Sequence, residues 1–148
     1  MATGTLPFTD LIVRDRASRV RLWVEVTRLP GLAASEATER RFWRLEELPQ
    51  KAPFLLVTPR VAYLWSVGAP DTSLPEQSVD MREELAPYFE RTHIDPEAVQ
   101  PIAFRMIVSS WLSDVLDRAG PWRPSWSWLE QAGVEPLPGG EIMVGDAA

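Results

Sequence analysis

Cysteine is absent from the 148 residues, and histidine and lysine each occur once, as His93 and Lys51. The lack of cysteine excludes disulfides, thiolate metal sites and a cysteine nucleophile. A single histidine excludes sites built from several histidines. Any bound metal would therefore need carboxylate and carbonyl oxygens, which suit a hard cation such as Mg²⁺. The scarcity of lysine becomes important below, because one candidate chemistry requires a lysine.

Long hydrophobic runs are also missing, since no stretch approaches the ~20 apolar residues of a membrane helix. The first residues lack the charged start and apolar run of a secretory leader, so we expect a cytoplasmic protein of bacterial type with no membrane partner. The net charge is −6, a poor match for a phosphate backbone. This balance disfavours nucleic-acid binding, although a local basic face could survive within an acidic total.

The length of the chain suits one domain. In its first half, five segments have apolar patterns that predict strands or a helix. Apolar and polar residues alternate over 20–28, which predicts a strand with Val20 on the side of Leu22 and Val24. With the apolar run at 8–13 it predicts an antiparallel hairpin. A helix is expected over 35–48, and strands over 54–58 and 61–65.

The helix expected over 35–48 has a start signal and an apolar stripe. Ser35 can cap it, and Glu36 then lies in the first turn, where the helix dipole favours a carboxylate. Phe42, Leu45 and Leu48 have the spacing of a buried stripe.

The second half predicts a surface loop over 68–77 and a helix over 78–90. A longer amphipathic helix is expected over 98–118, with Asp95 as its cap and Pro96 at its first position. The order of strands and helices indicates a sheet packed with helices, of α/β or α+β class.

The last segment, 121–148, is rich in tryptophan, with Trp122, Trp126 and Trp128 close together. Disordered tails are depleted in aromatic residues, so we expect this extension to pack either on the domain formed by 1–120 or on a partner. Two roles are open for the three tryptophans. They can belong to the core or a lid, or they can bind a partner, because tryptophan is enriched at interface hot spots.

Two carboxylates on the expected first hairpin form the candidate site. Asp10 lies on its first strand, and Glu25 shares a face of the second strand with Thr27 because the two residues are two apart. Neighbouring strands that each carry a carboxylate can hold Mg²⁺ for phosphodiester hydrolysis. The alternative is a pair of surface carboxylates that form ion pairs with Arg14 or Arg21.

The segments 8–13 and 22–27, followed by a helix and by the run 52–65, resemble the PD-(D/E)xK nuclease-like superfamily. The segment 108–116 fits the same group. The resemblance implies a restriction-endonuclease-like fold, with a mixed, mainly antiparallel sheet flanked by helices. It also places Asp10 and Glu25 at the metal-ligand positions.

Thr27 falls where that superfamily has its catalytic lysine. Threonine has no charge with which to stabilise a transition state. We therefore expect a catalytically degenerate domain without a cofactor. It would bind another protein subunit within a bacterial defence or DNA-metabolism complex. The alternatives are an active Mg²⁺-dependent DNA endonuclease that uses Asp10, Glu25 and a relocated cation, and a plain structural subunit.

Overall fold

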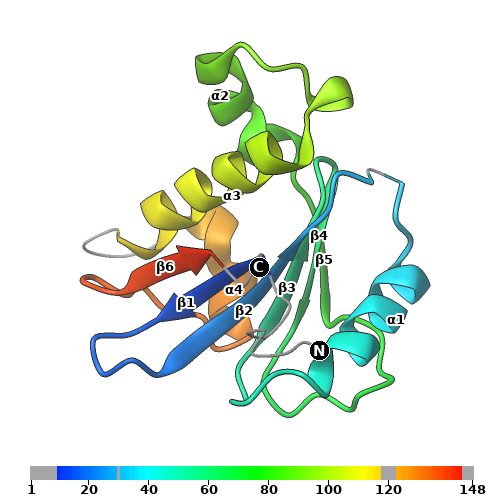
Figure 1. Cartoon of the computed structure of the whole chain (residues 1–148), viewed down its shortest axis with the longest axis vertical. Helices are drawn as coiled ribbons and strands as arrows, with labels where there is room; N and C mark the ends of the chain where they lie inside the picture. Colours follow the sequence, from blue (N-terminus) through cyan, green and yellow to red (C-terminus); the bar gives the residue numbers. More distant parts are fainter. Residues whose placement is uncertain (1–9, 30, 118–122, 145–148) are drawn as a thin grey trace, which may run out of the picture.

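The computed structural model describes residues 10–29, 31–117 and 123–144, which form one six-stranded sheet with helices on both faces (Figure 1). The strand order is β5-β4-β3-β2-β1-β6. The strands are β1 (Leu11–Arg14), β2 (Val20–Val26), β3 (Phe54–Val57), β4 (Val61–Trp65), β5 (Gln77–Asp80) and β6 (Glu141–Val144). The helices are α1 (Ala34–Leu45), α2 (Arg82–Thr92), α3 (Pro101–Leu116) and α4 (Ser127–Gln131), with short 3₁₀ helices η1 (Pro96–Ala98) and η2 (Pro124–Trp126). The expected α+β class is confirmed.

The centre of the sheet consists of two hairpins joined by a crossover. β1 and β2 pair antiparallel, with Leu11 opposite Val24, and β3 and β4 also pair antiparallel. β3 lies parallel to β2, with Trp23 opposite Phe54. A parallel connection needs a crossover, and α1 provides it. The predicted first hairpin and the two strands expected over 54–58 and 61–65 are present, and those two strands form a second hairpin.

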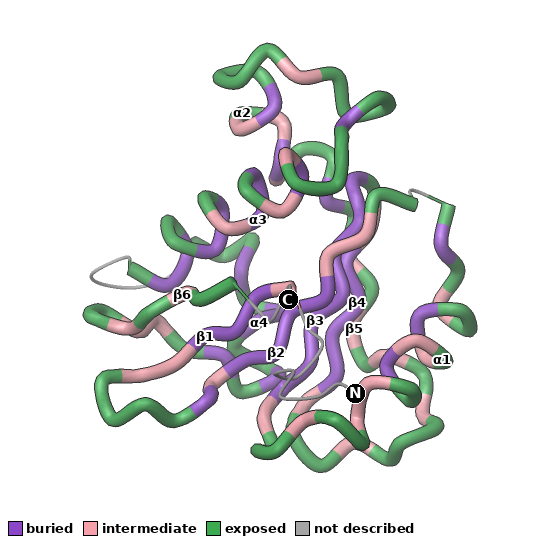
Figure 2. Tube along the Cα trace, viewed as in Figure 1, coloured by how far each residue is buried: buried purple, intermediate pink, exposed green. Residues whose placement is uncertain are grey.

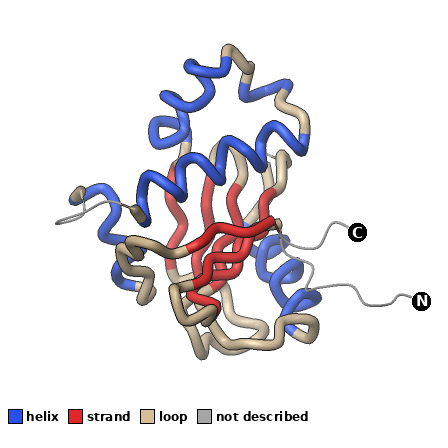
Figure 3. The backbone as a smooth tube through the Cα atoms, turned by 60° about the vertical axis from the view of Figure 1, so that its left-hand side comes forward, coloured by secondary structure: helices blue, strands red, loops and turns tan. Residues whose placement is uncertain are grey.

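Residue alternation along β2 places two different cores on the two faces of the sheet. Leu22 and Val24 pack with residues of α2, α3 and α4, whereas Trp23 packs with Leu32 and Ala37 on the side of α1. Figures 1 and 3 show α3 crossing one face while α1 lies on the other, and Figure 2 shows the buried strands between them. The predicted side of Val20 is wrong. The β1–β2 register shifts between Val13 and Arg14, and Val20 packs in the same core cluster as Trp23, on the α1 face of the sheet.

The crossover helix α1 begins earlier than predicted. Its N-cap is Ala33, whose N–H donates to a Glu36 carboxylate oxygen at 2.9 Å, so Ser35 is not the cap. The Glu36 carboxylate thus binds the N–H of the N-cap residue, which is the half of a capping box that the third helical residue supplies.

The apolar stripe predicted for α1 is wrong at Phe42, whereas Leu48, which follows the helix, packs against the core on this face. Phe42 is exposed and Leu45 is only partly buried, whereas Ala37 and Arg41 are buried. Arg41 donates to the carbonyl oxygens of Ala69 and Pro70 at 3.0 and 2.9 Å, which holds α1 to the loop after β4. A helix can be fastened by such bonds as well as by apolar contact.

Two boundaries in the second half differ from the sequence prediction. Residues 77–80 form the edge strand β5, and the helix expected to start at Ser78 starts at Arg82 as α2. Gln77 and Val79 face inward, the period-two pattern of a strand. Asp95 caps the short η1, because its carboxylate accepts a hydrogen bond from the N–H of Glu97. The longer helix α3 starts separately, at Pro101.

The described part of the C-terminal segment belongs to the same sheet and core. β6 pairs antiparallel with β1, with Val144 opposite Leu11, and forms an edge of the sheet. The η2 and α4 residues enter the core on the α3 side. The segment 121–148 therefore packs on the 1–120 domain wherever the structure describes it.

Candidate functional site

Glu25 lies on β2 beneath α1 and is held by two arginines of that helix. Its Oε2 lies 3.0 Å from a terminal nitrogen of Arg40, and its Oε1 lies 3.3 Å from Nε of Arg44. Glu25 is only 3% exposed. A carboxylate this buried is stable in its charged form only when it is paired and hydrogen-bonded, and the two guanidiniums provide both.

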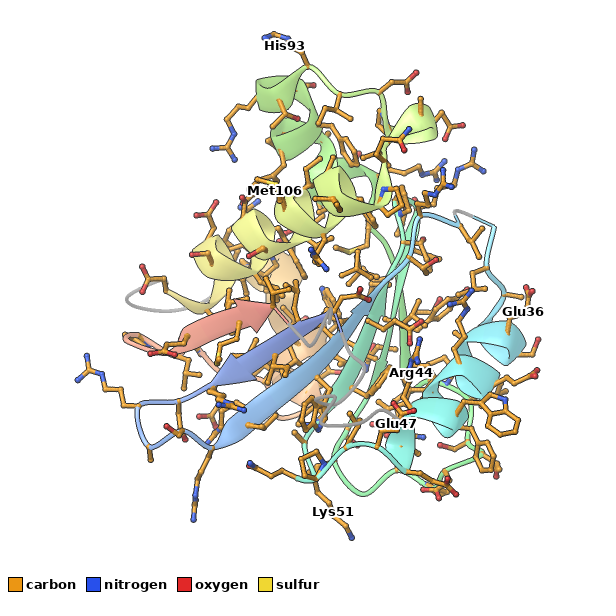
Figure 4. All side chains as sticks on the ribbon, in the orientation of Figure 1. Glu36, Arg44, Glu47, Lys51, His93 and Met106 are labelled. Atoms are coloured by element: carbon orange, nitrogen blue, oxygen red, sulfur yellow. The ribbon has the colours of Figure 1, made fainter. Side chains whose placement is uncertain are left out.

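Helix spacing explains why both arginines reach one carboxylate. Arg40 and Arg44 are four residues apart, so they lie on the same side of α1. The crossover from β2 to β3 places α1 over the face that carries Glu25. Figure 4 shows Arg44 on the side of α1 that faces the sheet. The prediction that Glu25 pairs with Arg14 or Arg21 is wrong, because Glu25 pairs with Arg40 and Arg44. Arg21 instead lies 3.6 Å from Asp15 in the turn.

Asp10 precedes β1 and its carboxylate extends the β1–β2 ladder by one bond. Its Oδ2 accepts a hydrogen bond of 2.7 Å from the N–H of Val26, at the end of β2. Burial raises the pKa of Asp10 above its ordinary value, the Val26 N–H opposes that rise, and the negative charge of Glu25 adds to it. The two acids are therefore within electrostatic reach, but each has its own protein partner.

Neither Thr27, which carries no charge, nor Lys51 supplies a cation near Asp10 and Glu25. The Thr27 N–H donates to Val57 O at 3.0 Å, and its hydroxyl accepts from Leu29 N at 3.4 Å in the turn after β2. Lys51 is exposed and precedes β3. Because β3 runs parallel to β2, Lys51 lies at the end of the sheet opposite Asp10, and Figure 4 shows it at the lower end of the molecule.

The residues at the predicted metal-ligand positions do not fit Mg²⁺. Guanidinium cations already contact both oxygens of Glu25, and a backbone amide binds an oxygen of Asp10. Among the described residues, no group of three or more His, Asp or Glu side chains could hold a metal ion. The site is instead a buried ion-pair cluster that joins α1 to β2.

Trp126 and Trp128, predicted as partner-binding residues, lie in the core, and Trp122 lies outside the described residues. The Trp128 ring stacks on that of Trp111 of α3, with 6.3 Å between ring centroids. The indole N–H groups of Trp111 and Trp126 both donate to one carboxylate oxygen of Glu84 on α2. The two described tryptophans of the tail thus fasten it to the domain.

A second polar cluster lies on the other face of the sheet, in a groove of about 650 Å³ between α2 and α3. The Tyr88 hydroxyl donates to Asp114 at 2.5 Å, and the Arg91 guanidinium lies 4.6 Å from the Tyr88 ring centroid. Burial, followed by the Asp114 hydrogen bond, raises the pKa of Tyr88 to about 12. His93 is exposed at the end of α2, in the left-handed conformation of a C-cap.

Sequence reasoning missed the two residues that decide the chemistry of Glu25. Arg40 and Arg44 belong to the helix expected over 35–48, and neither was among the candidate site residues. Their spacing of four, on a helix that must cross over the face carrying Glu25, was the available signal.

Comparison with models of protein families, with curated proteins and with solved structures finds no match. No helix within the described ranges has the length and apolar character needed to cross a bilayer.

Proposed function

We propose that this chain is a catalytically degenerate nuclease-like domain that acts by binding another protein subunit. Its setting would be a cytoplasmic bacterial assembly for defence or DNA metabolism. The observation that carries the loss of catalysis is the pairing of Glu25 with Arg40 and Arg44. The central β-hairpin, crossover helix and second hairpin support the nuclease-like resemblance, because they keep the order of the motifs on which it rests.

The pairing of Glu25 opposes metal binding for an energetic reason. A metal ion would have to displace two guanidiniums from a carboxylate that is almost fully buried. Breaking a buried ion pair by removing one partner typically costs about 3–5 kcal/mol. The site also lacks the lysine that the resemblance requires, since Thr27 occupies that position.

A role in binding is supported by apolar side chains on the surface. Trp43 of α1 is 67% exposed, and the adjacent Phe42 is 40% exposed. Adjacent exposed aromatic rings are characteristic of interaction surfaces, where aromatic residues are enriched. The net charge of −6 favours a protein partner over a nucleic acid.

The test is a plasmid nicking assay on the full chain with Mg²⁺ or Mn²⁺, with Asp10→Ala and Glu25→Ala as controls. We expect no metal-dependent nicking from the wild-type chain, and no shift of its melting temperature with either metal. Nicking by the wild-type chain would overturn the proposal, and its loss in both variants, each shown to be folded by circular dichroism, would establish the endonuclease alternative.

A further inference from the structure

Helix α1 separates its charged residues between two sides. Its three arginines point toward the protein: Arg40 and Arg44 bind Glu25, and Arg41 binds loop carbonyls. The acids Glu39 and Glu46 are exposed. Figure 2 shows exposed positions along the outer side of α1, and Figure 4 shows Glu36 pointing away from the sheet while Arg44 lies next to it. The outward side of α1 is thus acidic although the helix carries three arginines.

Two aromatic rings lie on this outward side. The rings of Phe42 and Trp43 meet edge to face, with 5.7 Å between their centroids. Among the tryptophans that the structure describes, the other five are buried and Trp43 alone is exposed. The outer patch of α1 is defined here as Glu39, Phe42, Trp43 and Glu46.

The spacing within the outer patch sets its geometry. Glu39 precedes Phe42 and Trp43 by three and four residues, and Glu46 follows them by four and three. Residues three and four apart are neighbours on a helix surface, so each acid borders both rings. The two acids are seven residues apart, which corresponds to roughly 10 Å along the helix axis. The patch is therefore an aromatic centre with a carboxylate at each end.

We propose that the outer patch of α1 docks a basic amphipathic helical segment of a partner protein. A helix lying alongside α1 repeats the same rise, so Lys or Arg residues seven apart would reach Glu39 and Glu46. Apolar side chains between those cations would cover the two rings. A cation near Trp43 also gains from the ring face. This inference rests on the proposed function only in taking the domain to act by binding.

Charge complementarity favours this occupant over phosphate-bearing ones. Nucleic acids and anionic lipid surfaces are attracted by exposed Lys and Arg. The arginines of α1 that could attract phosphate groups contact Glu25 or the loop carbonyls instead. The outer patch itself carries two carboxylates, which repel phosphate groups. A cationic protein segment meets no such repulsion.

The experiment uses the full chain, labelled with ¹⁵N, and two synthetic helical peptides. The first has Lys at positions i and i+7 with Leu at i+3 and i+4, and the second has Glu in place of both Lys. Binding is followed through the indole N–H signal of Trp43, assigned with Trp43→Phe. We expect the lysine peptide to shift this signal, with an affinity that falls as salt rises, and the glutamate peptide to leave it unmoved.

Variants locate the binding site. Trp43→Ala should weaken binding of the lysine peptide by about tenfold, as expected when an aromatic anchor is removed. The double variant Glu39→Gln, Glu46→Gln should weaken it and reduce its salt dependence. The matched control is Met106→Ala on α3, which removes an apolar side chain with 65% exposure on the other face of the sheet and should leave binding unchanged.

Three results would overturn the docking inference. These are equal binding of the two peptides, binding that Trp43→Ala leaves unaltered, and binding to vesicles of anionic lipid or to duplex DNA without binding to the lysine peptide. None of these three results bears on the nicking assay. Metal-dependent nicking would refute the degenerate-nuclease proposal while leaving the peptide titration as it stands, so the two failures are distinguishable.

Discussion

The carboxylate of Glu25 on β2 lies 3.0 Å from the guanidinium of Arg40 on α1, where the nuclease-like resemblance would place a metal ion. This contact and the one with Arg44 fix the rotation of α1 about its axis. Because the arginines face the sheet, Phe42 and Trp43 face outward. The interaction that occupies both oxygens of Glu25 thus also turns the two aromatic rings outward.

Glu25→Gln should destabilise the domain strongly. The substitution leaves the guanidiniums of Arg40 and Arg44 without their anion in a partly buried place, and we expect a loss of about 3 kcal/mol in the free energy of unfolding. Urea unfolding measures it. Glu39→Gln, on the outer side of the same helix, is the control and should change stability by less than about 0.5 kcal/mol. Equal stability of Glu25→Gln and the wild type would contradict the structural role of the cluster.

The sequence predicted those parts of the fold whose pattern has a single physical meaning. Alternation over β2 and the continuous apolar run of β3 both indicate strands, and both strands are present. β5 was missed because four residues that include Gln77, Ser78 and Asp80 carry too little apolar signal. Its strand conformation comes from pairing with β4, a tertiary effect.

The site was predicted only in part, for a similar reason. The hairpin placed Asp10 and Glu25 near enough for their charges to interact. The partners of Glu25 come from a helix whose rotation depends on tertiary contacts. Arginine is usually exposed, so a helix that buries Arg41 and turns Arg44 inward runs against the expectation drawn from composition.

Asp10→Asn should make stability less dependent on pH. The pKa of Asp10 is raised in the folded state, so above 3.8 the unfolded chain loses this proton first and folding stability falls as pH rises through the window up to the folded pKa. An asparagine stays neutral and still offers an oxygen to the Val26 N–H. We expect Asp10→Asn to be at least as stable as the wild type at pH 7, as judged by thermal unfolding from pH 3 to 7.

Asp10→Ala is the matched comparison for that measurement. It removes the acceptor of the Val26 N–H and should lower stability by about 1 kcal/mol. If Asp10→Asn were as unstable as Asp10→Ala, the amide hydrogen bond would not be the main role of this side chain.

Removing the tail should unfold the domain. A chain that ends at residue 119 lacks Trp126, Trp128 and strand β6, so the core beneath α3 is opened and β1 loses an antiparallel neighbour. We expect loss of cooperative thermal unfolding. Trp128→Ala alone should cost about 3–5 kcal/mol, whereas Met143→Ala on β6, whose side chain is exposed, should change little. A folded, monomeric truncated chain would show that the tail is dispensable.

The two tyrosines of the chain should both resist ionisation at high pH. Burial raises the pKa of Tyr63, whose hydroxyl donates to Leu32 O at 2.6 Å, and burial with the Asp114 hydrogen bond raises that of Tyr88 to about 12. The unfolded chain ionises its tyrosines first, near pH 10, so their contribution to stability is complete below that pH and is lost as pH rises toward 12. Tyrosinate absorbance at 295 nm should therefore rise for Tyr88 near pH 12, with Tyr88→Phe and Tyr63→Phe assigning the two transitions. A transition at or below pH 10 in the folded protein would show that the Tyr88–Asp114 hydrogen bond is not kept in solution.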